Sequence, residues 1–126
     1  MTGTLHANTI QKANGSPVDL TGQSAAKAWS NLNGTSTIAE RDSFNISGYV
    51  DNGTGDYTYT ISSDMSDANY AHFVDLGDEP AYVWTSIKEP ATAGTFRQTW
   101  FWHYTTAPAA VSDVNTSNLT INGDLA

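Results

Sequence analysis

The sequence predicts an all-β domain, an antiparallel β-sandwich of about six or seven short strands. Apolar and polar residues alternate with period two in several short runs, and turn-forming residues separate these runs at regular spacing. Nowhere do apolar residues recur with helical spacing for more than a turn or so. Short, evenly spaced strands are typical of a sandwich or a barrel. The length of 126 residues suits one domain with a real core.

The first predicted element, Ser24–Leu32, is ambiguous between helix and strand. Its alanines favour a helix, but Trp29 and Leu32 alone would give a thin apolar face, so a strand is preferred. The later elements alternate more clearly and are bounded by turn residues. These predicted strands are Phe44–Val50, Asp56–Ser62, Asn69–Asp75, Ala81–Ile87, Thr95–Thr105 and Asn118–Asn122.

The segment VDNGTGDYTYT, Val50–Thr60, joins two alternating runs and predicts a β-hairpin. Asn and Gly accept the positive φ that a tight connection requires. The alternative is an ion site, because short acidic and Gly-rich segments can wrap a cation or cradle a phosphate. A calcium loop of EF-hand type would carry a glutamate near Ser62 and Ser63, and a phosphate loop would carry a lysine and a following helix. The hairpin is therefore the favoured interpretation.

The charge balance and the lack of cysteine exclude several classes of partner and site. Five basic residues against 13 acidic ones give a net charge of -8 at pH 7, so we expect no nucleic-acid partner. The chain has no apolar run long enough to span a bilayer and no signal peptide, which predicts no membrane insertion. Without cysteine it has no disulfide, thiolate nucleophile or Cys-based zinc site. Its many Thr, Ser and Asn residues suit neutral, hydroxyl-rich partners.

Aromatic residues supply the candidate binding residues. In the run TWFWHY, Thr99–Tyr104, strand alternation makes both faces aromatic, so one face meets the core and the other needs a neighbouring subunit or a ligand. Sugar rings stack on aromatic planes while Asn, Asp and Thr bond their hydroxyls. Contact with the core or with a neighbouring subunit is the alternative for each residue. The candidate ligand-binding residues are Tyr82, Trp84, Trp100, Trp102 and Tyr104.

Neither catalysis nor a metal or cofactor site is expected. A glycosidase needs two carboxyl groups facing each other across a sugar, whereas the acids here are scattered over predicted turns, and no Gly-x-Ser-x-Gly elbow is present. The three histidines, His6, His72 and His103, form no His-x-His pair. One histidine per chain on a threefold axis would give three ligands, but a partly buried or hydrogen-bonded histidine is favoured.

The run Ala25–Phe73 resembles a module found near the C-terminal end of bacteriophage tail-fibre proteins. The resemblance is carried by AAKAW, NGT, RDSFN, DNGTGDYT, the Met before DANYA, and the terminal GDLA. It covers Leu5–Phe73 well, the last four residues weakly, and little between Val74 and Leu119. Where the family usually has an aliphatic residue after NYA, this chain has His72 and Phe73.

The resemblance implies an architecture and a function. Residues 1–23 would form an extended leader that joins a fibre shaft, and residues 24–126 a sandwich at the tip of a homotrimer, exposed on the virion outside the cell. The tip would be a non-catalytic adhesin for a host surface glycan or an outer-membrane protein. A structural trimerisation knob that caps the fibre without touching a receptor is the alternative. A lectin-like module of a cellular protein is a third hypothesis, which the fibre-like leader argues against.

Overall fold

The structure, a computed structural model, describes residues 25–77, 83–87, 91–102 and 110–126 of the chain. For residues 77, 83–87 and 102 it describes the backbone alone. Within these ranges it contains β-strands and no helix, and so no helix that is long and apolar enough to cross a membrane. The predicted leader, residues 1–23, lies outside the described residues.

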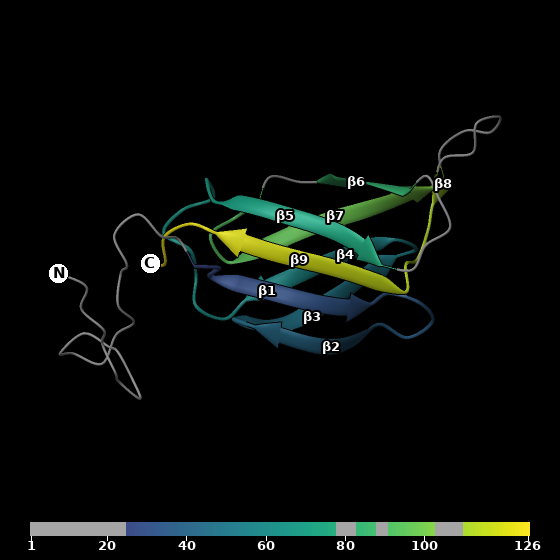
Figure 1. The fold of residues 1–126 in the computed structure, drawn as a ribbon, viewed down its shortest axis with the longest axis horizontal. Helices are drawn as coiled ribbons and strands as arrows, with labels where there is room; N and C mark the ends of the chain where they lie inside the picture. Colours follow the sequence, from purple (N-terminus) through teal and green to yellow (C-terminus); the bar gives the residue numbers. More distant parts are fainter. Residues whose placement is uncertain (1–24, 78–82, 88–90, 103–109) are drawn as a thin grey trace, which may run out of the picture.

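Two antiparallel sheets pack face to face, which confirms the predicted all-β sandwich (Figure 1). The first sheet has the order β2-β1-β9-β5, and the second has the order β3-β4-β7-β6, with β8 paired to β7. The first sheet comprises β1 Ala28–Asn33, β2 Ala39–Phe44, β5 Ala71–Gly77 and β9 Thr116–Asn122. The second comprises β3 Ile46–Gly53, β4 Asp56–Ile61, β6 Val83–Ile87, β7 Thr95–Trp102 and β8 Ala110–Val111.

Two of these strands, β2 and β8, are absent from the sequence prediction. Strand β2 (AERDSF) is an almost wholly exposed edge strand, so it shows no alternation of apolar and polar residues. Its register with β1 also shifts, because Asn31 pairs with Asp42 and Leu32 with Glu40, which leaves Arg41 as an extra residue in a bulge. Strand β8 has two residues, too few for a pattern. Charges and a bulge on an edge strand hinder pairing with another chain.

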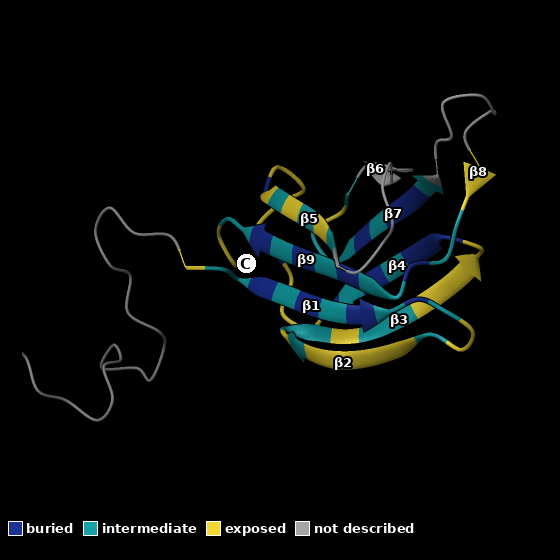
Figure 2. Cartoon of the chain, turned by 45° about the vertical axis from the view of Figure 1, so that its right-hand side comes forward, coloured by how far each residue is buried: buried dark blue, intermediate teal, exposed yellow. Residues whose placement is uncertain are grey.

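The core lies between the sheets and is built by the alternating inward residues of β1, β4, β7 and β9 (Figure 2). Its largest fully buried side chains include Trp100, Tyr57, Tyr59 and Phe96. The Tyr59 ring meets Tyr49 edge-on, with ring centroids 5.3 Å apart. Fully burying such aromatic side chains stabilises the fold by roughly 1.5–3 kcal/mol each.

A buried polar cluster crosses the middle of this core. The Nε2 amide of Gln98 on β7 donates hydrogen bonds to the Tyr59 hydroxyl on β4 and to the Ser117 hydroxyl on β9, both at 2.6 Å. The two hydroxyls are themselves 3.0 Å apart. Buried polar groups cost free energy unless they are hydrogen-bonded, so this cluster fixes how the two sheets register against each other.

The chain passes from one sheet to the other at Asn45, between β2 and β3. This residue has a φ of 57°, in the left-handed region that asparagine tolerates better than most residues. Its side-chain amide donates to the carbonyl oxygens of Lys27 and Ser63, at 2.9 and 3.1 Å, and its Oδ1 accepts from the Ser63 amide at 2.7 Å. One side chain therefore ties together three segments at this corner.

The predicted hairpin is confirmed between β3 and β4. Both of its glycines have positive φ, 127° at Gly53 and 65° at Gly55. Asp51 Oδ1 accepts from the Gly53 amide at 2.9 Å, and Asp113 Oδ1 accepts from the Gly55 amide at 2.7 Å. The loop's acidic and glycine residues therefore serve the turn itself, as the hairpin interpretation requires.

Candidate functional site

The aromatic residues selected from sequence fall mainly outside the described side chains. Tyr82 and Tyr104 lie outside the described residues, and for Trp84 and Trp102 only the backbone is described. Trp100 is the exception: it is 1% exposed and packs in the core, because it continues the inward alternation of Phe96 and Gln98 along β7. Trp100 therefore presents no surface to a ligand, and binding by the other four stays a prediction.

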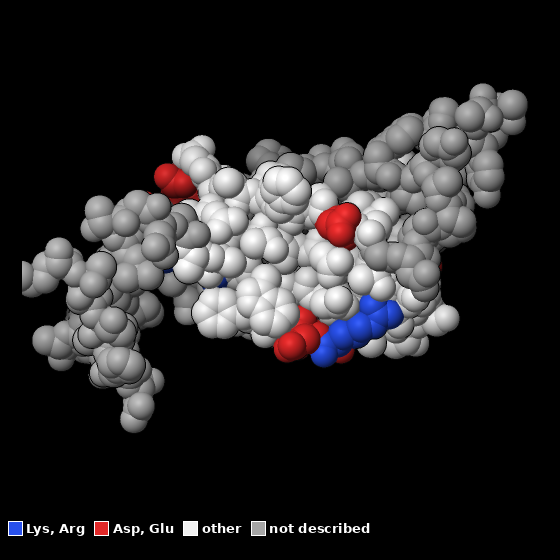
Figure 3. Space-filling view, viewed as in Figure 1, with Lys and Arg blue, Asp and Glu red and all other residues white. Residues whose placement is uncertain are grey.

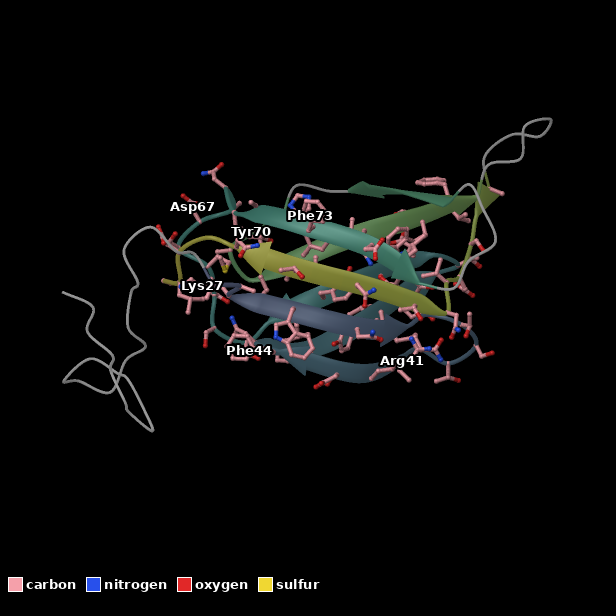
Figure 4. All side chains as sticks on the ribbon, viewed as in Figure 1. Lys27, Arg41, Phe44, Asp67, Tyr70 and Phe73 are labelled. Atoms are coloured by element: carbon pink, nitrogen blue, oxygen red, sulfur yellow. The ribbon has the colours of Figure 1, made fainter. Side chains whose placement is uncertain are left out.

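Exposed aromatic residues gather elsewhere, on the outer face of the four-stranded sheet, the face turned away from the second sheet. Phe73 on β5 is 78% exposed and Phe44 on β2 is 54% exposed, and Trp29 on β1 is partly exposed. Trp29 pairs with Phe44 on one side and with Thr120 on the other, and Thr120 pairs with Phe73. These four residues form one row across the sheet, here called the aromatic row. Figure 4 places Phe44 and Phe73 on its two edge strands.

A second row, of amides and carboxylates, lies two residues further along the same strands. Asp42, Asn31, Asn118 and Asp75 pair with one another in that order from β2 to β5. The Nδ2 amide of Asn31 donates to Oδ1 of Asn118 at 3.0 Å, which holds the two central side chains in place. This amide row puts hydrogen-bonding groups beside the aromatic row, with the acids at its two ends.

Arg41 completes the outer face at the end away from Phe44 (Figure 4). Its Nη1 donates to Asn31 Oδ1 at 3.3 Å and to Thr116 Oγ1 at 2.8 Å, and its Nη2 donates to Asn115 Oδ1 at 2.7 Å. All three acceptors are neutral. In the part of the chain that the structure describes, Arg41 forms no ion pair. Figure 3 shows separate red and blue groups on this face, with uncharged residues between them.

The outer face has the chemistry of a binding surface. Aromatic rings contact the apolar faces of a ligand, amides donate and accept hydrogen bonds, and the guanidinium offers a cation. A sandwich normally exposes polar residues on its outer faces, and contiguous exposed aromatic groups mark sites of interaction. Sequence reasoning missed this face because Phe44, Trp29 and Phe73 are far apart in the chain and only strand pairing aligns them. The available signal was Phe73, at a position where the module that the sequence resembles usually has an aliphatic residue.

Among the described residues, no cluster of side chains indicates a catalytic site or a metal site. Asp56, 5% exposed, is occupied by Arg97, whose Nε and Nη2 lie 2.9 and 3.1 Å from its two carboxylate oxygens. His72 points inward against Phe96, with ring centroids 4.8 Å apart, while His6 and His103 lie outside the described residues. Within the described ranges, no three His, Asp or Glu side chains come close enough to hold a metal ion.

A polar hollow at one end of the sandwich offers little by comparison. It is lined by Ser66, Asp67, Asn69, Tyr70, Gly123 and Asp124. The Asp67 carboxylate already accepts the backbone N–H of Asn69 at 2.6 Å, and the Tyr70 hydroxyl donates away from the hollow to the Thr92 and Thr95 carbonyls. These polar groups of the hollow already have partners in the protein, so they indicate no ligand.

In comparisons with known proteins, no family model matches the chain, and neither a curated protein nor a solved structure matches it. The functional argument therefore rests on the geometry of the outer face.

Proposed function

We propose that this chain is the non-catalytic tip domain of a phage tail fibre, exposed on the virion, and that it attaches to a receptor on the host cell surface through its outer face. The observation that carries the proposal is the aromatic row, which sets three aromatic side chains from three strands in one line on a solvent-exposed sheet face, with Thr120 between Trp29 and Phe73. The resemblance of Ala25–Phe73 to tail-fibre tips supplies the biological setting.

Physical reasoning supports a binding role for this row. An exposed phenylalanine gains nothing for the fold of a monomer, whereas burying one against a partner contributes roughly 1.5–3 kcal/mol. Phe73 is more exposed than any other large apolar side chain in the described ranges, and its neighbours Val74 and His72 already serve the inner face. The exposure of Phe73 is therefore best accounted for by a partner that covers it.

The competing proposal is a structural knob in which neighbouring subunits of a homotrimer cover the same row. Other exposed apolar residues favour a different trimer contact. Val50 on β3 is 51% exposed and Val111 on β8 is 45% exposed, and both belong to the second sheet. A trimer that uses these residues leaves the outer face of the first sheet open to a receptor, which is the arrangement we propose.

Adsorption of the fluorescently labelled 126-residue chain to a panel of bacterial strains tests the adhesin against the knob. We expect the chain to bind at least one strain, and Phe73→Ser to weaken that binding at least about tenfold, because one aromatic contact contributes about 1–1.5 kcal/mol beyond its buried area. The control is Leu125→Ser, at an exposed apolar residue that belongs neither to the aromatic row nor to the proposed trimer contact, and it should leave adsorption unchanged.

The knob predicts the reverse pattern. If Phe73→Ser abolished the trimer in light scattering while the unaltered chain adsorbed to no strain, the outer face would be a subunit contact and the adhesin proposal would be wrong. Circular dichroism of each variant separates both outcomes from unfolding.

A further inference from the structure

We infer that the outer face binds a short saccharide that carries one anionic group, laid along β1 and β9 with a sugar ring on the aromatic row and the anion on Arg41. The inference rests on the proposed attachment function and specifies its ligand. It follows from the order of the side chains along the two central strands and from the unusual situation of Arg41.

Arg41 is held in position by neutral acceptors, and it forms no ion pair with a described residue. A guanidinium has five N–H donors, and three of those on Arg41 are taken up by Asn31, Thr116 and Asn115. The N–H of Nε and the second N–H of Nη2 have no partner among the described residues. The adjacent carboxylate of Asp42 is turned to the backbone, where its Oδ1 accepts the Ser43 amide at 2.9 Å. In a chain of net charge -8, an arginine that is fixed in place and has no carboxylate partner among the described residues favours an external anion.

The free donors suit a carboxylate or a phosphate. Arginine binds both through paired N–H groups, and such charge-assisted bonds are roughly twice as strong as neutral ones. Because the neutral acceptors already restrict the side chain, binding an anion requires little further ordering of it. At physiological salt, the guanidinium attracts an anionic ligand over about 8–10 Å, the distance beyond which dissolved ions screen the interaction.

Three kinds of contact follow one another along the central strands. Trp29 on β1 and Thr120 on β9 belong to the aromatic row. The next outward-facing pair in the direction of Arg41 is Asn31 and Asn118. Two residues further in that direction on β9 lies Thr116, whose hydroxyl accepts a hydrogen bond from Arg41. Four residues of strand span roughly 13 Å. A ligand that reaches from the aromatic row to Arg41 is therefore a short oligosaccharide, with its middle hydroxyls over the two amides.

The acids on the face limit the charge of the ligand. Asp42 and Asp75 stand at the two ends of the amide row, three strand spacings or roughly 14 Å apart. A chain with an anion on every sugar would bring some of them close to these carboxylates, where like charges repel. A saccharide with one anion placed at Arg41 avoids this repulsion, so the face selects for a single negative charge.

Matched saccharides test the inference directly. Binding of the full chain would be measured on an array that holds neutral oligosaccharides, the same oligosaccharides ending in a uronic acid, and the same ones ending in a sugar phosphate. We expect at least one anionic form to bind about tenfold or more tightly than its neutral counterpart. Arg41→Gln should reduce that affinity to the neutral level. The matched control is Lys27→Gln, which removes the same charge from the residue just before β1, at the end of that strand away from Arg41 (Figure 4).

Each outcome of the array either supports or overturns the inference. A preference for the uronic acid or for the phosphate supports the inference and identifies the anion. Equal binding of neutral and anionic forms overturns it, as does an equal loss in Lys27→Gln, which would mean that only net charge matters. Adsorption to cells without binding to any saccharide also overturns it while leaving the attachment function standing, whereas a chain that adsorbs to no cell removes both.

Discussion

At the scale of single residues, Asn45 illustrates how one side chain joins the two sheets. Its left-handed backbone turns the chain from β2 into β3, and its amide satisfies backbone groups of Lys27 and Ser63. Few residues combine a tolerance for positive φ with both a donor and an acceptor. The sequence could not reveal this role, because asparagine is common in this chain and the bonded groups are distant in the sequence.

Replacing Asn45 should separate the two contributions. Asn45→Gly keeps the backbone angle and loses the side-chain bonds, so we expect a loss of about 1–3 kcal/mol of unfolding free energy. Asn45→Ala also suffers the steric cost of the left-handed region, about 1–2 kcal/mol more. Urea denaturation measures both variants. Equal stability of the two would show that the backbone angle contributes nothing.

Buried tyrosines should set an alkaline limit on stability. Burial raises the pKa of Tyr49 and of Tyr70 to about 12. Burial also raises the pKa of Tyr59 and of Tyr57, and at Tyr57 the Asp113 carboxylate adds to the effect. Below about pH 10 these groups are protonated in both the folded and unfolded chain, so their contribution to stability is fully present there.

As the pH rises further, the unfolded chain releases protons that the folded chain retains, and unfolding becomes more favourable. We expect stability to fall between about pH 10 and pH 12, by at most about 1.4 kcal/mol per pH unit for a fully buried tyrosine. The contribution of the partly exposed Tyr49 is smaller because solvent screens it. Urea midpoints across this range give the slope, which Tyr70→Phe should reduce. A midpoint that stays constant through the range would contradict the linkage.

At the scale of elements, the hairpin between β3 and β4 was predictable, but its two glycines are not equivalent. A Cβ at Gly53 would meet no atom, whereas one at Gly55 would collide with the Ser112 carbonyl oxygen on the segment after β8. The sequence showed the residues that favour the turn. It did not show that the segment around Ser112 packs on Gly55, because that segment lies almost 60 residues away in the chain.

This difference predicts unequal costs of substitution. Gly53→Ala should lose about 1–2 kcal/mol for the positive φ alone. Gly55→Ala has the same backbone cost, and it must also displace the backbone of Ser112, so its loss should be clearly larger. Thermal unfolding of the two variants compares them. A smaller loss at Gly55 would mean that the segment around Ser112 yields freely.

The same hairpin should be indifferent to calcium. Its carboxylate of Asp51 is engaged with the Gly53 amide, and the Asn52 side chain donates to the Thr58 hydroxyl at 2.9 Å. Addition of calcium or of a chelator should leave the melting temperature unchanged, because ligands stabilise only the states that they bind. A shift of several degrees with calcium would make the loop an ion site.

The sequence predicted elements where burial imposes a pattern and failed where it does not. Strands β4 and β9 bury nearly every second residue, so their alternation was readable. Strand β1 alternates as well, but its alanines left the sequence prediction ambiguous between helix and strand. The edge strand β2 buries almost nothing, so it was missed. The aromatic row on the outer face was missed for a related reason. Trp29, Phe44 and Phe73 stand alone in the sequence, and only the registers of β1 with β2 and β9, and of β9 with β5, bring them into one row.

At the scale of the whole molecule, we predict a homotrimer in solution. The second sheet exposes Val50 and Val111, and the chain has no disulfide that would stabilise it as an isolated unit. Light scattering at micromolar concentration should give three times the mass of one chain, and Val50→Asp together with Val111→Asp should shift it towards the monomer. A monomeric mass for the unaltered chain would contradict the prediction.

The order β2-β1-β9-β5 also has a consequence for how the protein folds. Strand β9 lies between β1 and β5, although it comes last in the chain. During synthesis, β1 and β5 leave the ribosome before the strand that joins them exists, and their buried faces have to wait for it. The β3–β4 hairpin can form early from neighbouring residues, whereas the four-stranded sheet requires closure of a loop from β1 to β9. Folding dominated by such distant pairings takes milliseconds to seconds, so we expect a slow folder that completes the outer face of its four-stranded sheet only in the last step.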